Sequence, residues 1–251
     1  MQINKFVFTL SAFLLLSASC YHETGSVDIN FSQTIDSKSI NFNELIYTNT
    51  AGNLYQINEI KYFISKMTFI DARGKAIEIT QDEGIHYVDC SIEKTLHWKI
   101  EGIPYGKYVG VSFVFGLDQN DNISNRFVNP PESNFSWPNH LGGGYHYMQI
   151  NGKFLNKEEK IQNLNIHTGI GQIYNENNEI TQFIHNHFTV MLPINLYIDA
   201  DKILCILPIN MEIQRWFDTP NLFNFNDFGF GIMQNQHAQE LLKGNAGNVF
   251  N

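Results

Sequence analysis

Several residue types and motifs on which common functions depend are scarce in this 251-residue sequence or missing from it. Lys and Arg number 16 against 25 Asp and Glu and form no basic stripe, so we expect no nucleic-acid partner. The sequence has no Gly-x-Ser-x-Gly elbow and no His-Glu-x-x-His pair, and no Lys-Ser/Thr helix start follows the glycine run at 142–144. These absences argue against a hydrolase and against a nucleotide-binding protein. We therefore predict that the chain is not an enzyme.

Cysteine is equally scarce, with three in the whole chain. One of them, Cys20, closes the N-terminal leader described below. The other two, Cys90 and Cys205, would be able to pair in an oxidising compartment. However, Cys205 lies in the strongly apolar run 203–207, which is typical of a buried thiol without a partner. The sequence thus favours two unpaired thiols over a disulfide.

Residues 1–19 predict a lipoprotein signal peptide. Lys5 precedes the apolar run 6–16, which is too short to span a membrane and has the proportions of a signal-peptide core. The residues after this run resemble a bacterial lipobox that ends at Cys20. We therefore expect a diacyl anchor on Cys20 and a short linker at 20–26. The protein would lie in the cell envelope at the outer membrane, facing the periplasm or the outside, and only the lipid would attach it.

Residues 27–251 predict one all-β domain, a β-sandwich with a short C-terminal helix. The 20 Phe and 11 Tyr favour sheets, where aromatic side chains pack on pleated faces. Alternation at 27–31 and the β-branched and aromatic run 55–71 are typical of strands. The pair Asn151-Gly152 predicts a hairpin turn. Helical spacing is clearest at 232–243, near the end of the chain.

The stretch 135–150 concentrates side chains that are able to bind a metal. It contains Trp137, His140, His146 and Met148, and three glycines divide it. The strand expected after these glycines places His146 and Met148 on one face. Imidazole and thioether ligands suit copper better than calcium or magnesium.

A later histidine, His167, lies in a strand expected at 164–169. Antiparallel pairing of this strand with the one that carries His146 would bring the two imidazoles across from each other. The alternative is that both are core histidines with satisfied hydrogen bonds. The copper hypothesis therefore predicts that His146, His167 and Trp137 converge. The competing hypothesis, a metal-free cell-surface β-sandwich that binds a glycan, peptide or partner protein, predicts an exposed aromatic patch instead.

Two further groups are secondary candidates for binding a metal. His185 and His187 are two residues apart, and on one strand they would share a face. Residues 118–122 concentrate Asp and Asn side chains of the kind that bind calcium. They lack the glycine and the closing glutamate of an EF-hand, however, so the pattern favours an ordinary surface loop.

An ordered series of short motifs resembles the MbnP-like family, and the similarity extends over most of the chain from about Val27. In order, the motifs are Tyr62-Phe-Ile-Ser65, Gly102-Ile-Pro-Tyr-Gly-Lys-Tyr108, Phe113-Val-Phe-Gly-Leu-Asp118, Trp137, Gly144-Tyr145, Gly152, His167-Thr-Gly169, Ile232-Met-Gln-Asn235 and the closing residues 245–250. This resemblance implies a secreted or periplasmic, β-rich, copper-binding protein.

The resemblance also implies roles for individual residues. Trp137 resembles a tryptophan that a dihaem peroxidase-like partner can oxidise to kynurenine, and His167 resembles the later histidine ligand of copper. His140 and His146 both follow Trp137, and either one is a candidate for the second histidine ligand. We therefore expect an envelope lipoprotein that binds copper at a Trp/His site and serves copper uptake or homeostasis.

Overall fold

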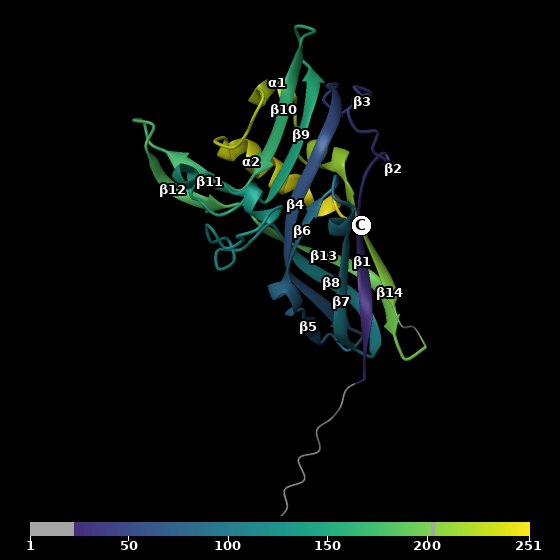
Figure 1. Ribbon diagram of the computed structural model, residues 1–251. Coiled ribbons are helices and arrows are strands. Elements are labelled where there is room, and N and C mark those ends of the chain that lie inside the picture. The colour runs from purple at the N-terminus through teal and green to yellow at the C-terminus, as the bar shows by residue number, and fades with distance from the viewer. Residues whose placement is uncertain (1–22, 202–203) are drawn as a thin grey trace, which may run out of the picture.

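The structure, a computed structural model, describes residues 23–201 and 204–251 and is all-β with short helices near the C-terminus (Figure 1). The all-β prediction is confirmed. The predicted signal peptide and the anchor residue Cys20 lie outside the described residues. Within the described ranges, no helix is both long and apolar enough to cross a bilayer.

Two sheets form the body of the protein. In the smaller sheet, β1 (Thr24–Ile35) pairs in parallel with β14 (Cys205–Glu212) and antiparallel with β7 (His97–Pro104) and β2 (Lys38–Ser39). The larger sheet has the order β10-β9-β4-β8-β13, and three short strands pair with β4. Its strands are β3 (Tyr47–Thr48), β4 (Leu54–Asp71), β5 (Ala76–Glu78), β6 (Ile85–Asp89), β8 (Gly106–Phe115), β9 (Met148–Leu155), β10 (Ile161–Thr168) and β13 (Phe188–Ile198).

Alternating apolar residues hold the two sheets together. In β1, Val27, Ile29 and Phe31 are buried, as the sequence predicted. Full burial of such a side chain stabilises the fold by about 1.5–3 kcal/mol. The long strand β4 crosses the whole body, since its first half pairs with β9 and its second half with β8. Near the middle of β4, residues 61–65 also pair with β6, so neighbouring strands hold them on both sides.

The predicted hairpin turn at Asn151-Gly152 is wrong. Both residues lie inside β9, where Asn151 is opposite Asn165, and the chain reverses later, at 156–160. A Cβ atom on Gly152 would lie 2.0 Å from the carbonyl oxygen of Gln56, next to a bulge in β4. The glycine thus permits a close approach of two backbones, a second role that glycine has inside strands.

Two predicted element boundaries also shift. The strand expected from Tyr145 begins at Met148, because the preceding residues bond to other segments. The C-terminal helix α2 (Gln236–Asn245) begins four residues after the predicted start. The Asn235 side chain accepts a hydrogen bond from the Ala238 amide at 3.0 Å and caps the helix there.

Cys90 and Cys205 are unpaired, as the sequence favoured. Cys205 is buried, and Cys90 is partly buried and accepts a hydrogen bond from the Ile60 amide at 3.2 Å. Burial raises the pKa of the Cys90 thiol to about 11, so the thiol is protonated and unreactive at neutral pH.

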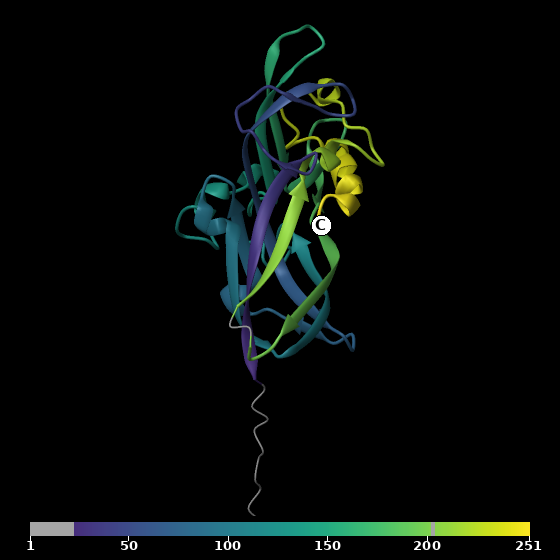
Figure 2. The same ribbon diagram turned by 90° about the vertical axis from the view of Figure 1, so that its right-hand side faces the viewer.

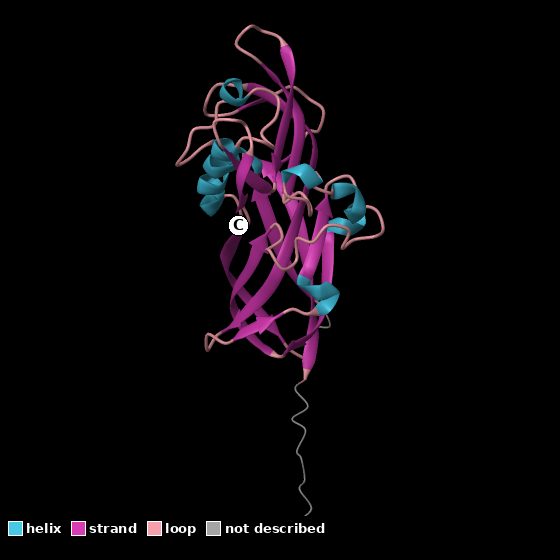
Figure 3. Cartoon of the chain, turned by 90° about the vertical axis from the view of Figure 1, so that its left-hand side faces the viewer, coloured by secondary structure: helices cyan, strands magenta, loops and turns pink. Residues whose placement is uncertain are grey.

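A third, two-stranded sheet projects from the body as a hairpin (Figure 1). It consists of β11 (Ile170–Tyr174) and β12 (Ile180–His185). Most helical segments gather around one half of the long strands (Figure 3). Besides α2, they are α1 (Phe225–Phe228) and short 3-10 turns at Gln81–Gly84, Glu93–Leu96, Glu132–Phe135, Asn139–Leu141, Ile213–Phe217 and Ala246–Asn248.

Candidate metal centre

Backbone pairing brings His146 and His167 together. His167 lies near the end of β10, opposite Gln149 of β9. His146 lies two residues before β9, where its amide donates to the Phe135 carbonyl at 3.0 Å. The next amide, that of Tyr147, donates to the carbonyl of Thr168 at 2.8 Å. The segment that carries His146 is therefore fixed between the Trp137 loop and the end of β10.

The two imidazole rings and the indole ring of Trp137 are neighbours. The ring centroids of His146 and His167 are 5.3 Å apart, with an interplanar angle of 81°. The centroids of Trp137 and His146 are 4.8 Å apart, with an angle of 77°. The side chains that the copper hypothesis requires to converge are thus in contact.

The hydrogen bond of His146 defines its tautomer. Its Nδ1 lies 3.1 Å from the carbonyl oxygen of Phe135, and since a carbonyl only accepts, Nδ1 has the proton. The lone pair is then on Nε2. That atom is buried and has no hydrogen-bond partner within the described part of the chain. A buried lone pair without a partner is costly in a folded protein and is accounted for where a ligand occupies it.

A chain of three residues defines the tautomer of His167. Its Nε2 lies 2.7 Å from Asn151 Oδ1, and Asn151 Nδ2 donates to Glu59 Oε2 at 2.8 Å. Because Glu59 takes the amide protons, Asn151 presents its oxygen to the ring, and His167 donates from Nε2–H. The lone pair of His167 is therefore on Nδ1. Such outer hydrogen bonds are the usual support of a histidine that ligates a metal.

Both imidazoles are neutral at neutral pH. Burial lowers the pKa of His146 to about 4. Burial, followed by the nearby His146 and the Lys61 ammonium, lowers the pKa of His167 to about 3. Neutral imidazole is the form that binds metals, so protons do not compete for these two nitrogens near pH 7.

Lys61 places a cation close to the pair. Its Nζ lies 2.5 Å from Glu59 Oε1 and 3.8 Å from Asp89 Oδ2, and it lowers the pKa of both histidines. Glu59, Lys61 and Asn151 were not selected from the sequence. Charged residues among the apolar residues of β4 could have indicated Glu59 and Lys61. Asn151 was missed because the pair Asn151-Gly152 resembles a turn motif.

Trp137 forms a wall of the site and offers no ligand atom. It is 2% exposed, and its Nε1 donates to the Leu141 carbonyl at 3.1 Å. An indole nitrogen has no lone pair for a metal. Gly169 packs closely against the indole ring, since a Cβ atom there would lie 2.7 Å from Trp137 Cε3.

The two remaining candidates from the stretch 135–150, His140 and Met148, lie elsewhere. His140 is exposed in the turn Asn139–Leu141, and none of the ring contacts of the described residues joins it to His146 or His167. Met148 is fully buried in the main apolar core. Of the two histidines that follow Trp137, the structure therefore pairs His146 with His167.

The prediction that His185 and His187 share a strand face is wrong. His185 ends β12, whereas His187 lies in the link before β13, so the chain changes sheets between them. Their ring centroids are 6.2 Å apart, and His187 contacts Tyr147 rather than the central pair. Burial lowers the pKa of both groups.

The acidic loop 118–122 is balanced by cations of the protein itself. Lys66 Nζ lies 3.0 Å from Asp121 Oδ2, and Arg126 Nη1 lies 3.1 Å from Asp121 Oδ1. The Asp118 side chain accepts hydrogen bonds from amides of its own loop. Across residues 23–201 and 204–251, no group of three or more His, Cys, Asp or Glu side chains is arranged to hold a metal ion. Any metal at the central site would therefore have two histidine ligands and depend on other donors for more.

Comparisons with known proteins agree with this fold. A family model described as MbnP matches residues 24–234. MbnP from Methylosinus trichosporium has a similar solved structure, with a TM-score of 0.53 over 80% of each chain and a sequence identity of 16%. At this identity, the similarity supports the fold alone. No curated protein matches the sequence.

Proposed function

The chain belongs to the MbnP family, and from this membership and the histidine pair we propose that it is a cell-envelope lipoprotein that binds copper for uptake or homeostasis. His146 and His167 are the proposed ligands. The observation that carries the proposal is the buried Nε2 lone pair of His146, which has no partner among the described residues and adjoins the His167 ring.

The chemistry of the pair favours Cu(I) over harder or more highly charged ions. Two neutral imidazoles suit a low-coordinate monovalent ion, whereas calcium and magnesium prefer oxygen ligands. Nitrogens about 2 Å from a shared ion place opposed ring centroids about 6 Å apart and bent pairs closer. The observed 5.3 Å is compatible with a bent pair. The nearby Lys61 ammonium disfavours a second positive charge on the ion.

Trp137 would contribute donor atoms to the metal site only after oxidation. By family resemblance, a dihaem peroxidase-like partner would convert it to kynurenine with peroxide as the oxidant. Relative to tryptophan, kynurenine has one more oxygen and one fewer carbon, which leaves as formate. A kynurenine would replace an indole that offers no lone pair with a carbonyl and an aromatic amine beside His146. Support for this proposal is the 4.8 Å separation of the Trp137 and His146 rings. Mass spectrometry of the peptide that contains Trp137, isolated from the native organism, tests it.

Anaerobic Cu(I) titration against a competing chelator tests the copper site. The wild type is expected to bind one ion tightly, and His146→Ala and His167→Ala are expected to lose that binding. His140→Ala is the matched control, because His140 is an exposed histidine nearby and is expected to leave affinity unchanged. Equal affinity in the wild type and both pair variants would refute the site.

A second candidate is a cell-surface binding protein that needs no metal. It is supported by the hairpin β11–β12, where Ile173, Tyr174 and Phe183 are 39%, 37% and 45% exposed. Exposed apolar groups of this kind mark interaction surfaces. This alternative predicts that binding of a glycan or protein ligand depends on Tyr174 and Phe183 and persists in His146→Ala.

A further inference from the structure

The described chain begins at one pole of the sandwich, where several strands end. β1 starts at Thr24, which pairs with Pro104 at the end of β7. The Tyr105 amide donates to the Glu23 carbonyl at 2.9 Å, which fixes the first described residue to the β7–β8 turn. The ends of β4, β8, β13 and β14 lie at the same pole (Figures 1 and 2). The route from the leader into the domain is therefore at this pole.

The distance between this pole and the proposed anchor is short. Four residue steps separate Cys20 from Thr24, and even a fully extended chain covers at most about 14 Å over four residues. The strand β4 alone, with 18 residues, extends about 60 Å. An acylated Cys20 would therefore keep this pole close to the bilayer. The side chains of the pole then determine the orientation of the domain relative to the membrane.

Amphipathic and cationic side chains collect at this pole and form what we term the base surface. Its members are Arg73, Lys75, Tyr105, Lys107, Tyr197 and Leu204. Tyr197 is 54% exposed and pairs with Lys107 across β13 and β8. Tyrosine and lysine suit the headgroup layer, because each combines an apolar body with a polar tip. Leu204 adds an aliphatic side chain that is 45% exposed.

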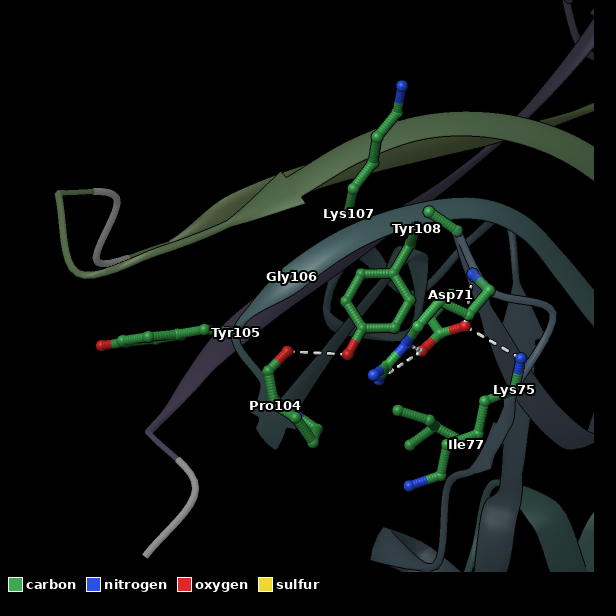
Figure 4. A pocket seen from close by; sticks show the side chains of 10 residues that line it. Asp71, Lys75, Ile77, Pro104, Tyr105, Gly106, Lys107 and Tyr108 are labelled. Carbon is green, nitrogen blue, oxygen red and sulfur yellow. Dashed lines mark hydrogen bonds and ion pairs between the residues drawn. The ribbon is translucent and has the colours of Figure 1, made fainter.

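A cavity of about 400 Å³ lies between the β4–β5 and β7–β8 turns of this pole (Figure 4). At its wall, Asp71 accepts two hydrogen bonds from the Arg73 guanidinium, which balances that carboxylate. Lys75 and Lys107 form no ion pair with any described residue, and Figure 4 shows Lys107 and Tyr105 extending away from the cavity. Two ammonium groups are thus free for an external anion.

Carboxylates also occur at this pole, beside members of the base surface. Asp199 and Asp201 lie in the loop after β13, and Glu23 is the first described residue. The whole chain has a net charge of −9. Attraction of the untethered domain to an anionic bilayer is therefore weak, and contact of the base surface with lipid depends on the proposed anchor at Cys20. The free lysines orient the tethered domain, since an anionic headgroup surface attracts each of them.

We propose that the base surface rests on phospholipid headgroups, with Lys75 and Lys107 on phosphate groups and Tyr105 and Tyr197 in the interfacial layer. This inference rests on the proposed lipid anchor. It places the copper site away from the bilayer: His167 is level with Lys61, ten residues along β4 from the base, or about 33 Å. The site then lies on the part of the domain that faces the envelope and its soluble partners rather than the membrane.

A tethered form of the protein tests the base surface without cellular lipidation. The chain from Cys20 onward, with Cys90→Ser, is coupled through the Cys20 thiol to a maleimide lipid in vesicles of dibrominated phosphatidylcholine and phosphatidylglycerol. Bromine quenches tryptophan fluorescence only at close range. In Tyr105→Trp, the fluorescence contributed by the introduced tryptophan is expected to fall by about half. The matched control Tyr174→Trp, on the projecting hairpin, is expected to lose none, and the three native tryptophans are common to both.

Charge reversal separates orientation from attachment. Lys75→Glu with Lys107→Glu is expected to abolish the quenching at position 105 while the protein still floats with the vesicles. Equal quenching at positions 105 and 174, or quenching that survives the charge reversal, would overturn the proposed orientation. The anchor is tested separately, because labelling of the full chain in cells with a palmitate analogue should disappear in Cys20→Ala. Failure of the anchor and failure of the base surface therefore give different results.

Discussion

Removal of the Asn151 side chain is the sharpest perturbation of the candidate metal centre. In Asn151→Ala, His167 loses the acceptor 2.7 Å from its Nε2–H, and Glu59 loses its donor at 2.8 Å. The imidazole is then free to rotate and to change tautomer, which moves the lone pair away from Nδ1. Loss of such an outer hydrogen bond lowers metal affinity about 10- to 100-fold. The unsatisfied polar groups should also lower the free energy of unfolding by about 1–3 kcal/mol.

Anaerobic competition titration with Cu(I) measures the affinity, and urea unfolding measures the stability. Asn163→Ala is the matched control, since Asn163 is exposed on β10 and forms no side-chain hydrogen bond with the described residues. Asn151→Asp keeps an acceptor for His167 and should keep the affinity at pH 8, but its charge should raise the pKa of His167 and make binding sensitive to acid. A loss of stability in Asn151→Ala with unchanged copper affinity would refute the positioning role.

Three further predictions follow from contacts around the pair. Burial lowers the pKa of His146 to about 4 and that of its partner imidazole to about 3, so Cu(I) affinity should be constant from pH 8 to pH 5 and fall only below about pH 4. A Cu(I) affinity that begins to fall near pH 6.5 would indicate that exposed histidines are the ligands instead. Lys61→Met removes a cation beside the pair and should improve Zn(II) affinity relative to Cu(I) by roughly tenfold, as for a unit charge about 10 Å away at an effective dielectric constant of about 20. Gly169→Ala forces a methyl group against Trp137 and should cost about 1–3 kcal/mol in urea unfolding, whereas Gly247→Ala, with open space at its Cβ, should not.

The sequence predicted those parts of the fold that depend on local pattern. Alternation located β1, and the aromatic and β-branched run located β4, since side-chain period and residue type are local properties. Gly152 was assigned to a turn because a close approach to the backbone of Gln56 is a tertiary contact that no local pattern records. The start of α2 was missed for a different reason, because the Asn235 cap outweighed the helical spacing of the residues before it.

The candidate site was partly predictable in the same way. His146 and His167 were selected by residue type and by an expected antiparallel pairing, and the structure brings their rings into contact. The choice between His140 and His146 was left open, since a glycine-broken loop fixes no register. Asn151 and Lys61 were not selected, because their importance depends on which strands lie beside them.

The parallel pairing of β1 with β14 determines how the domain would resist a pulling force. Eight successive residue pairs join the two strands, from Val27↔Cys205 to Thr34↔Glu212. A force applied at Thr24 and directed out of the pole acts along β1, so it loads the hydrogen bonds of this ladder together in shear instead of peeling them apart one at a time. The antiparallel ladder to β7 shares the same load. A domain held by its first strand in this way would resist extraction by tension at its N-terminus, which suits a protein that is attached there.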